Sequence, residues 1–301
     1  MATDTTRDPR GGEKGQGILE HRQRTLAIRR LRRHKAAVVG GAILFVMVLS
    51  ALFAPLIAPY DPIAMDLSLD LNPPSTDHLL GTDSFGRDIL SRILFGARVS
   101  LFIGLTSVGW AALVGVPAGL VAGYYGGAVG TLLMRLVDAL LSFPPILLAI
   151  AISASMGGGQ GTVIFALGMI YVPVFARLVR GSTLSLREEV FVMAAESYGA
   201  GSIKILLRHI LPNMVGIIVV QATIGFSSAI ISEATLSFLG LGVPPPLPSW
   251  GRDLNDARAY IRESWWLVMI PAMTIVINVL GINFLGDGLR DALDPRMRTR
   301  G

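Results

Sequence analysis

The sequence predicts an all-α integral membrane protein with six transmembrane helices. Of its 301 residues, 52% are hydrophobic and only 16% are charged, whereas a soluble domain carries about 25% charged residues. Its apolar runs reach the roughly 20 residues that cross the hydrocarbon core of a bilayer. Basic residues gather in the segments on one side of these runs. The chain is therefore expected to pass through a membrane several times.

The chain begins with a basic segment ahead of the first apolar run. Residues 1–17 are polar and of mixed charge, and we expect no fixed structure there. Six arginines alternate with apolar residues from Ile18 to Lys35, which favours a helix lying on the inner membrane surface. Residues 1–35 are thus expected to be a cytoplasmic basic tail and interfacial helix. Residues 36–58 follow as the first transmembrane helix, in the manner of an uncleaved signal anchor.

Residues 59–98 form an acidic, irregular segment that we expect to be an extracytoplasmic loop. Asp88 and Arg92 lie four residues apart near its end, in a stretch that favours a helix. Such a pair on an exposed helix face contributes about 0.2–0.5 kcal/mol. We therefore expect an exposed ion pair of little consequence.

The core, residues 99–290, contains the other five predicted transmembrane helices. They are expected at residues 99–122, 131–153, 162–179, 214–231 and 266–285. The two prolines of Ser142–Pro145 should break or bend the second of these five helices. Near its start, Arg135 and Asp138 are three residues apart and can neutralise each other. A packing pair is the favoured interpretation, and a functional pair stays open.

The polar segment 181–212 predicts a helix-turn-helix between two membrane spans. Ser185 and Glu188 have the spacing of a capping box, which marks a helix start, and Gly199 suits a helix stop. The first helix would then contain about thirteen residues, or about 20 Å. A second short helix begins at Ser202 and is expected to end before Pro212, because proline removes a backbone hydrogen bond.

Residues 240–264 form the second predicted extracytoplasmic loop, with an extended proline run and a short amphipathic helix. Its polar and aromatic residues are candidates for contact with a substrate-delivery protein: Trp250, Arg252, Asp253 and Asp256. The alternative is a lid that only covers the helix ends. Residues 291–301 are expected to be a cytoplasmic tail.

The distribution of basic residues predicts the orientation. With both termini inside and six crossings, the inner segments contain 20 Lys and Arg, against 6 in the two large outer loops. Cytoplasmic segments carry the excess of positive charge in membrane proteins. The rule therefore places segment 181–212 in the cytoplasm.

The cytoplasmic segment resembles a motif of known transporters. Ala194 and Ala195, followed by Gly199 and by Ile210–Pro212, resemble the "EAA" loop of bacterial ABC-importer permeases, with Met193 in place of the motif's Glu. The resemblance implies that the first helix of the loop enters a groove of an ATPase subunit. The residues assigned to this coupling are Glu189, Met193, Ala194, Ala195, Glu196, Gly199, Leu211 and Pro212. The alternative from the residues alone is an amphipathic helix on the membrane surface.

Two further stretches resemble one branch of these permeases. HLLGTDSFGRDILSRILFGARVSL, residues 78–101, and EATLSFLGLGVPPPLPSWG, residues 233–251, are similar to the C-type permease subunit of dipeptide and oligopeptide importers. The resemblance implies a type I ABC-importer permease fold in the bacterial plasma membrane. It also implies a second related permease, two ATPases, an extracytoplasmic binding protein and a peptide cargo. Nickel and glutathione stay open as cargo.

Polar side chains inside the predicted spans are candidates for the transport pathway: Gln221, Thr223, Ser227, Ser228 and Asn278. Each could instead form a hydrogen bond with a neighbouring helix.

Other function classes lack a sequence signal. The chain contains no cysteine and four scattered histidines, so it offers no spacing typical of a metal site. GGGQG at residues 157–161 lacks the Gly-Lys-Ser/Thr ending of a phosphate loop, so ATP and Mg²⁺ are expected on partner subunits. We therefore expect no cofactor and no catalysis in this chain. Its charge flanks the membrane spans, which argues against nucleic-acid binding. A secondary transporter that works without ATP is the competing class.

Overall fold

The computed structural model describes residues 34–293, and this range is mainly α-helical, with an irregular segment at residues 58–88 that contains an isolated bridge between Thr82 and Asp88. Most of the predicted interfacial helix at residues 18–35 and most of the tail at 291–301 lie outside it. Five helical segments are long and apolar enough to cross a membrane. They are α2 (Lys35–Ile57), α3 (Ile89–Tyr125), α6 (Gln160–Arg187), Ser202–Phe238, which contains α9 (Leu211–Phe238), and α11 (Trp266–Leu293).

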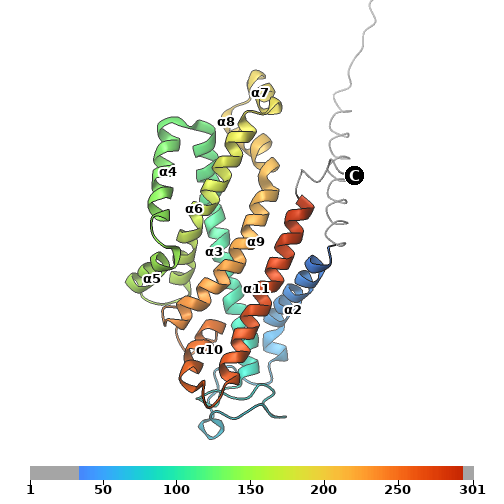
Figure 1. The fold of residues 1–301 in the computed structure, drawn as a ribbon, viewed down its shortest axis with the longest axis vertical. Coiled ribbons are helices and arrows are strands. Elements are labelled where there is room, and N and C mark those ends of the chain that lie inside the picture. Colours follow the sequence, from blue (N-terminus) through green and yellow to red (C-terminus); the bar gives the residue numbers. More distant parts are fainter. Residues whose placement is uncertain (1–33, 294–301) are drawn as a thin grey trace, which may run out of the picture.

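A further apolar segment consists of two helices separated by a sharp bend. α4 (Gly127–Leu141) and α5 (Pro145–Met156) meet at an angle of 86° and lie beside α6 (Figure 1). Pro144 takes an extended conformation and Pro145 occupies the first turn of α5, where its missing N–H costs nothing. The predicted break at Ser142–Pro145 is confirmed.

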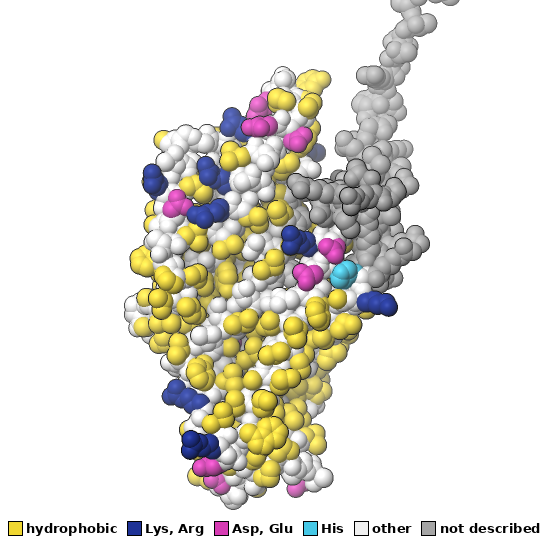
Figure 2. All heavy atoms as spheres, viewed as in Figure 1, with side chains coloured by type: hydrophobic (Ala, Val, Ile, Leu, Met, Phe, Trp, Pro, Cys, Tyr) yellow, Lys and Arg dark blue, Asp and Glu magenta, His cyan; other side chains and the backbone are white. Residues whose placement is uncertain are grey.

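The outer surface of the helices is apolar, as a lipid environment requires. Phe45, Val46, Leu52 and Leu56 of α2 have exposed fractions of 63%, 62%, 63% and 80%. Figure 2 shows that the lower half of the face in view is mostly hydrophobic, with charged side chains above it and at its lower tip. This arrangement fits a bilayer around the middle of the helices.

α3 and α6 pack closely because α3 carries glycine every fourth residue. A Cβ on Gly115 or Gly119 would lie 2.6 Å from the Val172 carbonyl oxygen or 2.5 Å from that of Ala176. Gly123 continues the same face against Thr183. Small residues at this spacing let two membrane helices approach backbone to backbone.

Asp138 forms its ion pair with a different residue from the one predicted. Its carboxylate accepts a hydrogen bond from Arg177 of α6 at 2.7 Å, not from Arg135 on its own helix. Both side chains of the pair are more than half exposed. The helical spacing identified the acid correctly, but α6 supplies the nearer cation.

The capping box prediction is wrong. Helix α6 continues through Ser185 to Arg187, and the Ser185 hydroxyl donates to the Gly181 carbonyl oxygen within that helix. A hydroxyl can cap a helix only where the preceding residues are not already helical. α7 starts after Glu189 and covers Val190–Ser197, so it has 8 residues instead of about thirteen.

The predicted helix end before Pro212 is also wrong. The short helix α8 (Ser202–Ile205) continues through a π-helical turn, Leu206–Ile210, into α9. In that turn the Leu211 N–H donates to the Leu206 carbonyl oxygen, five residues earlier. The widened turn absorbs the proline, which lacks an N–H and clashes with a regular α-helical turn.

Candidate functional site

The short helices outside the apolar spans lie at opposite ends of the long helices (Figure 1). α7 and α8 lie at one end. At the other end, α10 (Trp250–Ala257) lies beside the irregular segment that precedes α3. We call residues 59–88 and 249–260 together the polar cap.

α7 has one buried and one exposed face. Val192 is fully buried and packs with Tyr124 of α3 and with Ile205 and Ile210 of the α8 region. On the opposite side, Val190 and Met193 are 74% and 49% exposed. Together with the exposed Ala194 and Ser197 they form a stripe at positions i, i+3, i+4 and i+7, which we call the α7 stripe. This mostly apolar stripe is presented to solvent on a short, anchored helix.

Gly199 ends α7 as the sequence predicted. Its φ of +76° is a conformation that favours glycine. The N–H of Ala200 donates to the Ala195 carbonyl oxygen at 3.0 Å, as expected just after a helix end. The turn is exposed and brings the chain directly into α8.

The predicted coupling residues divide between these faces. Met193 and Ala194 belong to the α7 stripe, and Glu189 is the residue before the helix. Ala195 packs inward, and Glu196 accepts a hydrogen bond from the Tyr124 hydroxyl at 3.1 Å. Leu211 and Pro212 start α9, beyond the π-helical turn, and Leu211 packs against the same buried cluster as Val192.

The predicted pathway residues differ in burial. Asn278 of α11 is fully buried, and neither its amide nitrogen nor its amide oxygen has a partner within the described residues. Ser227 is also buried, whereas Gln221, Thr223 and Ser228 are half-buried. Thr223 donates to the Val219 carbonyl oxygen of its own helix at 2.9 Å. In this conformation the burial of Asn278 does not fit a role in lining an open channel.

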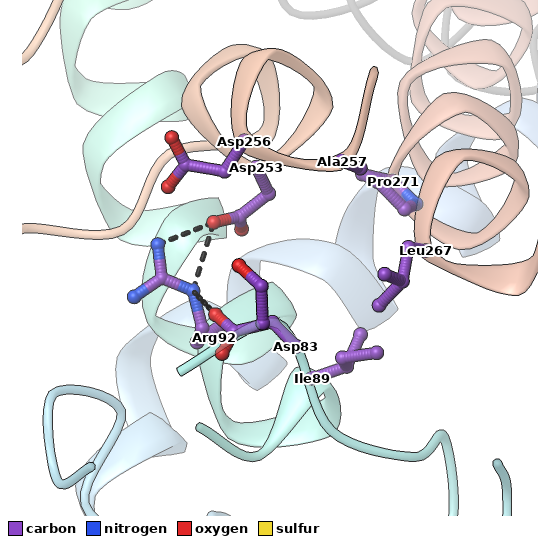
Figure 3. A pocket seen from close by; sticks show the side chains of 9 residues that line it. Asp83, Ile89, Arg92, Asp253, Asp256, Ala257, Leu267 and Pro271 are labelled. Atoms are coloured by element: carbon purple, nitrogen blue, oxygen red, sulfur yellow. Dashed lines mark hydrogen bonds and ion pairs between the residues drawn. The ribbon is translucent and has the colours of Figure 1, made fainter. Parts of the chain in front are cut away.

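The polar cap is held by buried ion pairs (Figure 3). Arg92 of α3 donates to Asp253 of α10 through Nε at 2.8 Å. Its Nη1 donates to the Pro62 carbonyl oxygen. The two paired side chains are only 3% and 12% exposed. Burial raises the pKa of the Asp253 carboxyl, and the charge of Arg92 acts in the opposite direction. The pair joins two segments that are 161 residues apart.

The predicted exposed pair of Asp88 and Arg92 is therefore wrong. Asp88 is buried, caps α3 by accepting from the Ser91 N–H at 2.8 Å, and contacts His78 Nδ1 at 2.9 Å. Spacing within one helix could not reveal His78 or Asp253, because these partners come from the loop and from α10.

The candidates for contact with a delivery protein lie mainly inside the polar cap. Trp250 is fully buried, and its Nε1 donates to the Ile93 carbonyl oxygen at 3.1 Å. Its side chain therefore does not lie at the surface, where a contact with a delivery protein would need it. Asp256 contacts Arg87 at 3.2 Å and Arg252 at 2.9 Å. Arg252, at 23% exposure, is the most accessible of the three charged candidates.

Sequence reasoning missed the role of Glu233. This residue of α9 is fully buried and accepts hydrogen bonds from Ser100 of α3 at 3.0 Å and from Ser237 at 2.8 Å. The carboxylate joins the two long helices α3 and α9. A lone acid at the edge of an apolar run was the available signal, but its partner Ser100 lies 133 residues away in the sequence.

The enclosed space in the polar cap is small. Asp83, Arg92, Asp253 and Leu267 border a cavity of about 20 Å³ (Figure 3), which is room for about one water molecule. Among residues 34–293 no three His, Cys, Asp or Glu side chains come together in a way that could hold a metal ion.

Known proteins share both the sequence and the fold. Residues 115–299 match the family model described as "Binding-protein-dependent transport system inner membrane component". Residues 23–74 match the N-terminal transmembrane domain of oligopeptide transport permease C. A solved structure of the MetNI methionine ABC transporter in an inward-facing conformation aligns with a TM-score of 0.58. At 20% identity, over 68% of this chain and 98% of the other, that alignment shows the fold alone. The predicted all-α permease fold is confirmed.

Curated relatives are similar over almost the whole chain. The dipeptide transport system permease protein DppC of Alkalihalophilus pseudofirmus is 46% identical over 91% of this chain and 90% of its own length. The di/tripeptide permease DppC of Pseudomonas aeruginosa is 44% identical over 88% of this chain and 90% of its own. The glutathione permease GsiD of Escherichia coli is 48% identical over 90% of this chain and 89% of its own length. The chain therefore belongs to the family of inner membrane components of binding-protein-dependent transport systems.

Proposed function

We propose that this chain is one of two transmembrane permease subunits of an ABC importer that brings dipeptides or short oligopeptides into the cytoplasm. The observation that carries the proposal is the α7 stripe. An exposed apolar stripe on an anchored helix, outside the membrane spans, is suited to the groove of a partner protein. Relatives named for dipeptide and di/tripeptide transport support the choice of cargo.

In this proposal the α7 end lies in the cytoplasm with both chain termini, and the polar cap lies outside the plasma membrane. The partner at the α7 stripe is one of two ATPase subunits, which bind ATP and Mg²⁺. The chain itself catalyses no bond chemistry. When ATP brings the ATPases together, the α7 helices of the two permeases approach each other and the pathway opens outward. Hydrolysis then returns the permeases to the inward state.

An extracytoplasmic binding protein delivers the peptide to the polar cap in this scheme. The buried ion pairs make the cap a firm platform, and Arg252, which is 23% exposed, is with its surroundings the proposed contact surface. Trp250 and Asp253 would act from within the cap by fixing its shape, because their side chains are buried.

Glutathione is the second candidate cargo. It is a tripeptide, and the relative named for glutathione transport is 48% identical to this chain. Nickel has no comparable support among the relatives described above. A transporter without ATPase partners would leave the α7 stripe without an occupant.

Co-purification and reconstitution test the proposal. The chain is extracted from its native membrane in mild detergent, the accompanying proteins are identified, and ATP hydrolysis is measured with dipeptides, tripeptides and glutathione. We expect a second permease, ATPases and hydrolysis that rises with the binding protein loaded with its cargo. A chain that purifies alone and transports peptide in vesicles without ATP would overturn the proposal.

A further inference from the structure

The inner end of α3 holds three side chains from three different helices. The Tyr124 hydroxyl of α3 donates to Glu196 of α7 at 3.1 Å, and Arg187 Nη1 of α6 donates to the Tyr124 carbonyl oxygen at 2.8 Å. The Arg187 guanidinium also lies 5.6 Å from the centre of the Tyr124 ring. We call Tyr124, Arg187 and Glu196 the Tyr124 junction.

The junction satisfies a local need of α3. The last carbonyl groups of a helix have no partner within that helix. Arg187 supplies one donor for them, and as a cation it also suits the negative end of the helix dipole. The last residue of α6 is thereby attached to the last turn of α3.

α7 depends on such contacts for its position. A helix of 8 residues is too short to be stable alone in water. Only Glu188 and Glu189 separate it from the end of α6. Two contacts fix it from the side: the buried Val192 in the cluster with Tyr124, and the hydrogen bond from Tyr124 to Glu196.

α3 extends from this junction to the polar cap without interruption. Its 37 residues correspond to about 55 Å at 1.5 Å rise per residue. Its glycine face packs against the α6 backbone, so the two helices are expected to move as one unit. Near its other end, Arg92 holds Asp253 of α10. A displacement of α7 that reaches Tyr124 therefore also reaches the polar cap.

We propose that Tyr124 and Glu196 are positioning residues that transmit the movement of α7 to the α3–α6 pair. The inference rests on the proposed function, since it assumes an ATPase partner at the α7 stripe. It assigns Glu196 to an internal contact, whereas Met193 and Ala194 face the partner. The hydroxyl of Tyr124 acts through Glu196 and touches neither nucleotide nor cargo.

The test compares variants in the reconstituted full complex, with peptide import and ATP hydrolysis measured together. Tyr124→Phe removes the donor, Glu196→Ala removes the acceptor, and the double variant removes both. Glu196→Gln retains an acceptor oxygen at the same place. Tyr125→Phe is the matched control, because it removes the hydroxyl of the neighbouring tyrosine, which is 51% exposed.

We expect Tyr124→Phe and Glu196→Ala each to raise the ATP consumed per imported peptide by about fivefold, which is the lower end of typical coupling between two sites. The double variant should be no worse than either single variant, because both remove one interaction. Glu196→Gln and Tyr125→Phe should stay near the unaltered ratio. In all variants the ATPase should co-purify normally.

An unchanged ratio in Tyr124→Phe, or losses that add in the double variant, would overturn the positioning role while the importer proposal stands. Met193→Asp separates the two ideas, because it places a charge on the α7 stripe and should abolish association with the ATPase. If the unaltered chain binds no ATPase at all, the proposed function itself fails.

Discussion

At the residue scale, burial separates two pairs of opposite charge. Arg92 and Asp253 are 3% and 12% exposed, whereas Arg177 and Asp138 are 60% and 55% exposed. Removing one partner of a buried pair leaves an uncompensated charge and costs several kcal/mol. Removing one partner of an exposed pair costs at most about 1 kcal/mol.

Asp253→Asn is therefore expected to destabilise the protein by about 3 kcal/mol, and Asp138→Asn by less than about 1 kcal/mol. Thermal unfolding in detergent measures both variants against the unaltered chain. Equal effects of the two substitutions would show that the polar cap is not held by its buried pair.

Residue identity alone could predict little of how the polar cap is held together. Asp88, Arg92 and Asp253 were each visible as charged residues near span ends, but the pairing of Arg92 with Asp253 crosses 161 positions. Likewise, Trp250 looked like a surface aromatic residue and is fully buried. Spacing reports neighbours on one helix, and partners from distant segments leave no trace in it.

At the scale of elements, the close packing of α3 on α6 gives a sharp prediction. A side chain on Gly119 would meet the backbone of Ala176, whereas Gly109 of the same helix has no atom within 4 Å of a new Cβ. Gly119→Val should separate the two helices and lower both stability and transport. Gly109→Val carries the same change in helix propensity and should be tolerated. Thermal unfolding and peptide uptake are measured for both variants and compared with the unaltered chain.

Some elements were predictable and others were not, for physical reasons. The double proline at Pro144–Pro145 removes backbone donors wherever it occurs, so the break after α4 followed directly from the sequence. Pro212 acts by the same rule, but a π-helical turn of five residues takes up its clash and the helix continues. The spacing of Ser185 and Glu188 does not by itself start a helix, because α6 is already formed at Ser185 and ends only at Arg187.

At the scale of the whole molecule, the orientation of the chain can be measured directly. The chain has no cysteine, so a single introduced cysteine reports one position without further changes. Tyr198, just after α7, is 93% exposed, and Arg258 follows α10 on the surface at the other end. Tyr198→Cys should react with an impermeant reagent only from the cytoplasmic side, and Arg258→Cys only from outside. The reverse pattern would overturn the proposed orientation.

The central claim is that an ATPase subunit binds the α7 stripe, and site-directed crosslinking in the assembled complex tests it most directly. Ala194→Cys lies on the exposed stripe and Val192→Cys on the buried face, two residues apart on the same helix. With short thiol crosslinkers and single cysteines in the ATPase groove, position 194 should give a crosslinked product of permease and ATPase, and position 192 should give none. Crosslinks from 192, or none from 194 in a complex that still hydrolyses ATP in response to peptide, would contradict the account.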